Sequence, residues 1–142
     1  MNIDFHVLDT YNSQQAWLFV CHLLEQHYLA KQQVYLAMDT RVEAQRFDQL
    51  LWTFRDDSFI PHEVSDGLLP SNSPIIIGYE PPHRETPREF IINLSQQVPA
   101  QYDEFQHLIE VVFNDPSVQQ RARERYKLYR DQQHHLNTIK QR

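Results

Sequence analysis

The chain has 142 residues, of which 41% are hydrophobic and 23% charged, and this is enough apolar sequence for one soluble domain over residues 1–142. The net charge of −6 argues against broad nonspecific attraction to nucleic acid, which needs a basic surface. No apolar run approaches the roughly 18 residues that span a bilayer, and the N-terminus lacks a signal-peptide pattern, so we expect a cytoplasmic protein without membrane contact.

Short apolar runs predict the strands of a sheet. Five of them have the length and composition of strands: residues 2–8, 34–38, 75–79, 90–94 and 108–113. The first alternates apolar and polar residues, whereas VYLAM and IIIGY are continuously apolar, which is typical of strands covered on both faces. Phe59–His62 is expected to be a brief extended segment, because Pro61 suits the edge or end of a strand.

Capping residues and helical spacing predict three main helices. Ser13 is expected to cap a helix that runs to about Lys31, and Thr40 a helix over residues 41–54. Asp115 is expected to cap a third helix with a proline at its first position. Residues 100–106 suggest a further short helix. The apolar stripes expected in the core are Trp17, Val20, Cys21, Leu24, Tyr28 and Leu29 in the first helix, and Ala44, Phe47, Leu50, Leu51 and Phe54 in the second.

The order of these elements predicts a three-layer α/β domain with a mainly parallel sheet. This fold class invites a nucleotide hypothesis, but phosphate-binding turns need glycines that let the backbone approach the anion. Gly67 and Gly78 are the only glycines in the sequence, so neither a dinucleotide fingerprint nor a P-loop is possible. We therefore expect an α/β scaffold without a nucleotide-binding loop and without a cofactor.

The sequence predicts no catalytic or metal site. Its single cysteine, Cys21, excludes an internal disulfide and lies in the apolar helical run WLFVCHLL, where a small buried hydrophobe is expected. The eight histidines form no HExxH motif, and no GxSxG motif is present. Asp56–Ser58 contains two neighbouring carboxylates that could form an acid–base pair, but its composition is typical of a solvated turn. No constellation for acid–base or nucleophilic catalysis remains.

The most informative stretch is DPSVQQRARERYKLYR, residues 115–130, which carries five Arg or Lys residues on an otherwise acidic chain. Helical spacing divides it into two neighbouring stripes. A packing stripe contains Val118, Ala122, Arg125 and Tyr129; an outer stripe contains Gln119, Arg123, Tyr126 and Arg130, with Lys127 at its edge. Charge alone is typical of a solvated helix face, but a tyrosine among arginines favours a specific acidic ligand.

Three stretches resemble the chi subunit family of the bacterial DNA polymerase III holoenzyme. They are ARERYKLYR followed by Leu136–Thr138, the helical segment that ends in Leu51–Trp52, and Phe59–His62. Their order and spacing fit across nearly the whole chain. The first motif is fairly specific, whereas the other two are weak alone.

The resemblance implies a nonenzymatic, Rossmann-like accessory protein of the clamp-loader complex. Members bind the acidic, Phe-ended C-terminal tail of single-stranded DNA-binding protein through one surface and the psi subunit through another. The resemblance implies a repair helicase as a further partner of the second surface. The positions of this chain that match the family's tail-binding residues are Trp52, Arg123, Tyr126 and Lys127. Local geometry adds Arg121 and Arg130. Phe59 belongs to the psi-binding side.

This sequence departs from the family pattern in two places. Gln119 stands where the pattern has a Lys, which weakens one expected contact to the tail. After the basic helix the chain reads HHLNT, where the family often has an aromatic residue before LN, and it ends in KQR without a final Trp. Different packing is therefore expected in the segment that follows the helix.

Two other functions compete with this interpretation. An α/β scaffold can serve as a nucleotide-binding domain or an enzyme of unknown substrate. The basic helix could also bind single-stranded DNA directly, although the overall acidity of the chain disfavours it. Trp52 likewise has two interpretations: it lies off the core stripe, so its ring either walls a pocket or packs in the interior.

Overall fold

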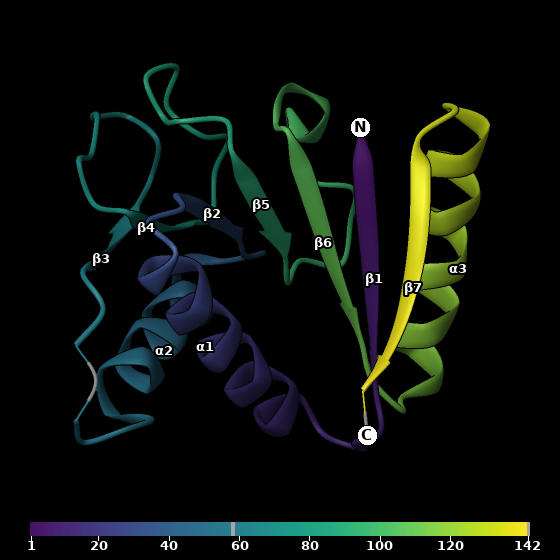
Figure 1. Cartoon of the computed structure of the whole chain (residues 1–142), viewed down its shortest axis with the longest axis horizontal. Helices are drawn as coiled ribbons and strands as arrows, with labels where there is room; N and C mark the ends of the chain where they lie inside the picture. The colour runs from purple at the N-terminus through teal and green to yellow at the C-terminus, as the bar shows by residue number, and fades with distance from the viewer. Residues whose placement is uncertain (58, 142) are drawn as a thin grey trace.

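The computed structural model describes residues 1–57 and 59–141, whose strands form one parallel sheet with helices on both faces (Figure 1). The strand order is β3-β4-β2-β5-β6-β1-β7. The strands are β1 (Asn2–Leu8), β2 (Val34–Ala37), β3 (His62–Ser65), β4 (Ile75–Gly78), β5 (Phe90–Asn93), β6 (His107–Val112) and β7 (His135–Gln141). The expected three-layer α/β class is confirmed, and every paired strand is parallel to its neighbour.

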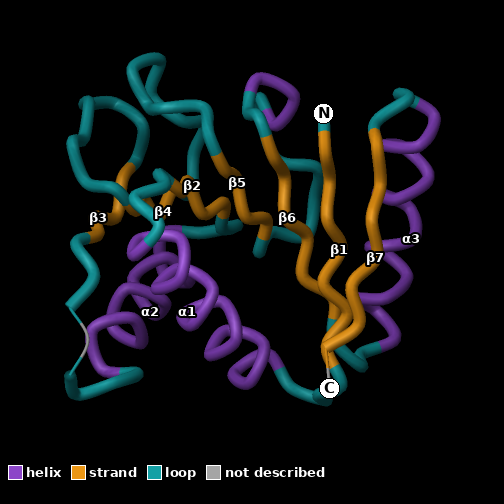
Figure 2. The backbone as a smooth tube through the Cα atoms, viewed as in Figure 1, coloured by secondary structure: helices purple, strands orange, loops and turns teal. Residues whose placement is uncertain are grey.

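Two helices cover one face of the sheet and one covers the other (Figure 2). α1 (Ser13–Leu29) and α2 (Arg41–Thr53) pack side by side, while α3 (Pro116–Asp131) lies on the opposite face beside β7 and β1. None of the described helices is long and apolar enough to cross a membrane. Because α3 contains the basic stretch of the sequence, this stretch is separated from α1 and α2 by the sheet.

The helix starts follow the capping residues, with one correction. Thr40 accepts a hydrogen bond from the Glu43 N–H, and Asp115 accepts one from the Val118 N–H, as expected. Ser13, however, is the first helical residue of α1. The cap is Asn12, whose side chain accepts from the Gln15 N–H. Asparagine caps at least as well as serine, so the pattern alone did not distinguish the two positions.

The expected core stripes are buried or partly buried, with one exception at the end of α1. Ala44, Phe47 and Leu51 of α2 are buried against the sheet. Cys21 is fully buried, and this burial raises the pKa of its thiol to about 12, which keeps it uncharged. Leu29 is wrong as a core residue: it is the last residue of α1 and is 73% exposed.

Three segments differ from expectation. Phe59–His62 lies mostly before the strand, since β3 begins only at His62, after Pro61. The short helix expected over residues 100–106 is a single 3₁₀ turn at Tyr102–Glu104. β7 was not predicted: it is an edge strand with mostly exposed side chains, and its sequence HLNTIKQ carries little of the apolar pattern that marks a buried strand.

Candidate functional site

The two stripes of α3 separate as the spacing predicts. The packing stripe is turned to the sheet, where Ala122, Arg125 and Tyr129 are buried. The outer stripe borders a cavity of about 400 Å³ between α3 and the sheet, which we call the α3 groove. The residues that line it are Phe5 and Val7 of β1, Val112 of β6, Gln119, Ala122, Arg123, Tyr126, Lys127 and Arg130 of α3, and Thr138 of β7.

The floor of the α3 groove is apolar and belongs to the sheet. Phe5 and Val112 are almost fully buried. Val7 is half-buried; it lies on the same face of β1 as Phe5 and pairs with Val112 of β6. The ring of Tyr126 lies against Phe5, with 5.3 Å between the ring centroids. Such a floor can bury an aromatic or aliphatic side chain of a ligand.

The rim of the α3 groove is cationic. Arg123, Lys127 and Arg130 all line it, and no acidic side chain is found among its described lining residues. Arg123 and Lys127 make no ion pair or hydrogen bond within the described part of the chain. Among the same described residues, the Arg130 side chain makes one long, exposed contact, of 3.8 Å between its Nε and Asp131 Oδ1. These cations are therefore available to an anionic ligand.

Trp52 does not join this groove. It lies near the end of α2, on the opposite face of the sheet from α3, and its ring neighbours are Phe59 and His62 at centroid distances of 5.4 and 4.6 Å. The structure thus does not bring Trp52 together with Arg123, Tyr126 and Lys127 as the resemblance implied. Its partial exposure, 47%, confirms only that the ring is not a core side chain.

Trp52 and Phe59 instead form a surface of their own, which we call the aromatic edge patch. Phe59 is 64% exposed and lies just before β3, the edge strand of the sheet. Beneath Trp52, the His62 side chain is almost completely buried. Its Nδ1 donates to the Ile60 carbonyl at 2.6 Å, and its Nε2 lies 3.1 Å from Asp48 Oδ1 without the alignment of a hydrogen bond. The patch therefore lies over a buried histidine side chain.

Arg121 is also separate from the α3 groove. It lines a different cavity, of about 370 Å³, on the side of α3 that faces the start of α1 and the loop after β5. Arg46 and Arg125 line the same cavity. Because Arg121 and Arg123 are two residues apart, the helix turns them to different sides. Of the two residues that local geometry added to the expected site, only Arg130 lies at the groove.

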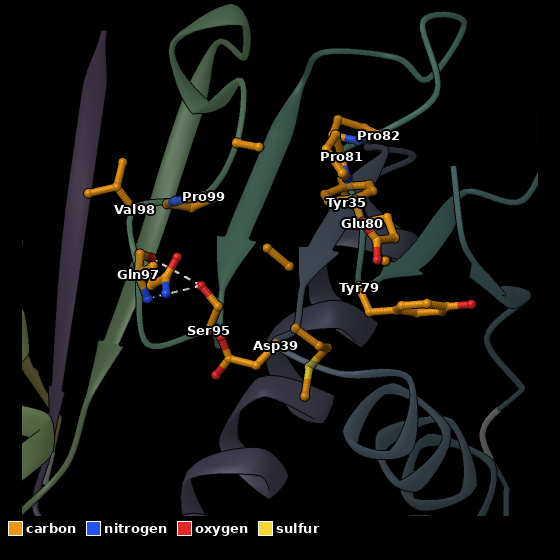
Figure 3. A pocket seen from close by; sticks show the side chains of 14 residues that line it. Tyr35, Asp39, Tyr79, Glu80, Pro81, Pro82, Ser95, Gln97, Val98 and Pro99 are labelled. Carbon is orange, nitrogen blue, oxygen red and sulfur yellow. Dashed lines mark hydrogen bonds between the residues drawn. The ribbon is translucent and has the colours of Figure 1, made fainter. Parts of the chain in front are cut away.

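A third cavity, of about 180 Å³, lies at the carboxyl ends of β2, β4 and β5, where α/β folds often hold ligands (Figure 3). Its polar side chains include Asp39 and Glu80, and none of the residues that line it is Arg or Lys. Ser95 is hydrogen-bonded to the Gln97 backbone. This lining offers a phosphate group two carboxylates and no countercharge, so the cavity gives no support to a nucleotide function.

The described residues form no metal-binding site, and the thiol of Cys21 is buried. They contain no group of three His, Cys, Asp or Glu side chains that could hold a metal ion. His134 contacts the rings of Tyr102 and Tyr129. The candidate site is thus a binding surface with two parts, the α3 groove and the aromatic edge patch.

The floor of the groove was missing from the sequence-based site. Phe5 and Val7 were expected in a strand, but the sequence did not place that strand beside the basic helix. Thr138 was missed because β7 itself was missed. The alternation of apolar residues in β1 was the available signal, since it marked a face that some helix had to cover.

Comparison of the sequence with known proteins identifies its family. The profile of the family described as DNA polymerase III chi subunit, HolC, matches residues 1–137. A DNA polymerase III subunit chi from Pseudomonas aeruginosa is 30% identical over 131 residues, which cover 92% of this chain and 89% of the relative. Those of Haemophilus influenzae and Escherichia coli are 29% and 28% identical, over 83% and 84% of this chain and 82% and 81% of the relatives. The chain belongs to the DNA polymerase III chi subunit family.

Proposed function

We propose that the chain is a nonenzymatic accessory subunit of the DNA polymerase III clamp-loader complex in the cytoplasm, and that it binds the acidic C-terminal tail of single-stranded DNA-binding protein. Membership of the chi family supports a place in the polymerase. The observation that carries the choice of ligand is the α3 groove, which combines an apolar floor with three cations and has no acid among its described lining residues.

The chemistry of the groove matches a peptide with several carboxylates and a final aromatic residue. The guanidinium groups of Arg123 and Arg130 can each grip a carboxylate through two hydrogen bonds, and Lys127 adds a point charge. The terminal ring packs on the floor beside Phe5 and Tyr126. Gln119, at the same groove, contributes a neutral polar contact in place of a cation.

The aromatic edge patch is the proposed contact with the psi subunit. Exposed large aromatic side chains that lie together mark protein interfaces, and Trp52 and Phe59 are such a pair. Trp52 belongs to this surface and not to the tail site, because its ring contacts Phe59. A repair helicase that used the same patch would compete with psi.

The test of tail binding is a titration of a fluorescent acidic peptide ending in Asp-Phe with a free carboxylate, followed by anisotropy. We expect binding that weakens as salt rises from about 0.05 to 0.3 M, because exposed charges are screened. In Arg123→Ala, the affinity should fall about tenfold or more through loss of a charge-assisted contact. A C-terminally amidated peptide should also bind more weakly.

Arg121→Ala is the matched control, because it removes the same charge from the same helix but at a different cavity. It should change the affinity far less than Arg123→Ala. Equal binding by the parent and Arg123→Ala, or equal losses in the two variants, would show that the α3 groove is not the binding site. Failure of the parent to bind the peptide at all would overturn the proposed function.

A further inference from the structure

A buried carboxylate lies beneath α3 and is not part of either proposed binding surface. Glu110 of β6 is fully buried. Asn93 Nδ2 lies 3.2 and 3.0 Å from its two oxygens, Arg125 Nε donates to Oε2 at 3.1 Å, and the Tyr129 hydroxyl donates to the same oxygen at 2.6 Å. Burial raises the pKa of Glu110, and the Arg125 charge and the three donors oppose that rise.

Two of these partners come from α3 and converge on one oxygen. Arg125 and Tyr129 are one turn apart on the packing stripe, and both contact Glu110 Oε2. Arg125 Nη1 also donates to the Gln96 carbonyl at 3.1 Å, beyond the end of β5. Directional bonds at two successive turns fix both the rotation of α3 about its axis and its position along the sheet.

The rotation of α3 decides which side chains face the groove. Tyr126 and Arg130 each follow one of the Glu110 partners in sequence, so each is displaced by about 100° around the helix. The other side chains that pack α3 on the sheet, such as Ala122 and Val118, are apolar and nondirectional. Without Glu110 they would tolerate a small rotation that moves Tyr126 and Arg130 away from the floor of the groove.

We propose that Glu110 is a positioning residue for peptide binding at the α3 groove. It does not line the groove. It acts through Arg125 and Tyr129, which hold the helix so that the cations and Tyr126 face the ligand. This inference rests on the proposed function, since it names the internal contact that prepares the same site.

A role in stability alone makes a different prediction. Replacing a whole buried ion pair by apolar residues of similar volume is often neutral or stabilising, whereas removing one partner leaves an uncompensated charge. The variant to make is therefore Glu110→Leu, Arg125→Met and Tyr129→Phe together. Asn93 keeps a partner in this variant, because its Nδ2 also donates to the Gln97 carbonyl at 2.9 Å.

Three measurements on the triple variant test the proposal. Its Tm should equal or exceed that of the parent, while its affinity for the acidic peptide should fall about tenfold. In NMR spectra, the cross-peaks between the Tyr126 and Phe5 rings, whose centroids are 5.3 Å apart, should weaken. A folded variant with parental affinity and unchanged cross-peaks would overturn the proposal.

Tyr129→Phe provides a second test should the triple variant not fold. It removes one hydroxyl and keeps the ring contacts with Phe5 and Tyr102. We expect a folded protein with about threefold lower affinity, and unchanged affinity would contradict the positioning role. If the parent protein fails to bind the peptide, the proposed function is wrong, and the ring cross-peaks still decide whether Glu110 positions α3.

Discussion

Gly78 lies at the end of β4, where the backbone passes directly against the ring of Tyr35 on the neighbouring strand. A methyl group on Gly78 would lie 2.0 Å from Tyr35 Oη and 2.3 Å from Cζ, far inside van der Waals contact. The Tyr35 ring is buried, and its hydroxyl donates to the Glu80 carbonyl, so the ring is held in place. Only glycine fits at this position without a displacement of the Tyr35 ring.

We expect Gly78→Ala to lower the free energy of unfolding by about 1–3 kcal/mol through overpacking. Urea unfolding of the parent and the variant measures the difference. In a Tyr35→Leu background the same substitution should have a smaller effect, because the obstructing ring is gone. An equal effect in both backgrounds would mean that the loss comes from the strand backbone and not from the ring.

At the residue scale, helical spacing separated the two stripes of α3 correctly, including Arg125 and Tyr129 as packing residues. It could not identify what they pack against. Glu110 is the single acidic residue within LIEVVF. The neighbouring sequence does not indicate that an arginine and a tyrosine of a later helix contact it. Contacts between distant segments depend on the strand order, which periodicity does not encode.

β7 is the element that completes the α3 groove, and its register decides which side chains point into it. Thr138 pairs with Phe5 of β1 and lines the groove. Ile139 pairs with His6, whose ring contacts Phe19 of α1, so Ile139 lies on the other face of the sheet. Successive residues of this strand thus face different surroundings.

This alternation gives a matched pair of variants. Thr138→Glu places a carboxylate in the groove and should weaken binding of the acidic peptide about tenfold through like-charge repulsion. Ile139→Glu adds the same charge one residue further on, on the opposite face, and should leave the affinity close to that of the parent. Anisotropy titrations of both variants at low salt compare them. Equal weakening in the two would contradict the register described for β7.

At the element scale, the sequence identified the strands that are buried on both faces and the helices with clear caps. It missed β7 because an edge strand with exposed side chains needs no apolar pattern. It placed β3 too early because Phe59–His62 has the composition of a strand, whereas Pro61 lacks the N–H that a ladder needs. The two errors fall at the two edges of the sheet, where burial imposes the least pattern.

Across the whole molecule, the two proposed binding surfaces lie near opposite edges of the sheet. β3 and β7 end the strand order, and six strand spacings separate them, or about 29 Å. The aromatic edge patch adjoins β3, and the α3 groove lies on β1, β6 and β7. The expected single site that combined Trp52 with Arg123 is thereby divided into two surfaces that do not overlap.

We therefore expect independent binding of the two partners. Phe59→Ala should weaken binding of the psi subunit about tenfold and leave the affinity for the acidic peptide unchanged, whereas Arg123→Ala should do the reverse. Calorimetric titration of the peptide into the protein with and without psi measures any coupling. A large change in peptide affinity when psi is bound would contradict independent surfaces.

The position of β1 also affects the order in which the molecule can assemble. β1 lies between β6 and β7, and in the register its Asn2 pairs with His107 and His135. Both partners of the N-terminal strand are made more than a hundred residues later, so β1 waits unpaired through most of synthesis. Contacts of such high sequence separation close late in folding. The floor of the α3 groove therefore forms only after β6, α3 and β7 have been made, so the groove is absent from the chain until synthesis is nearly complete.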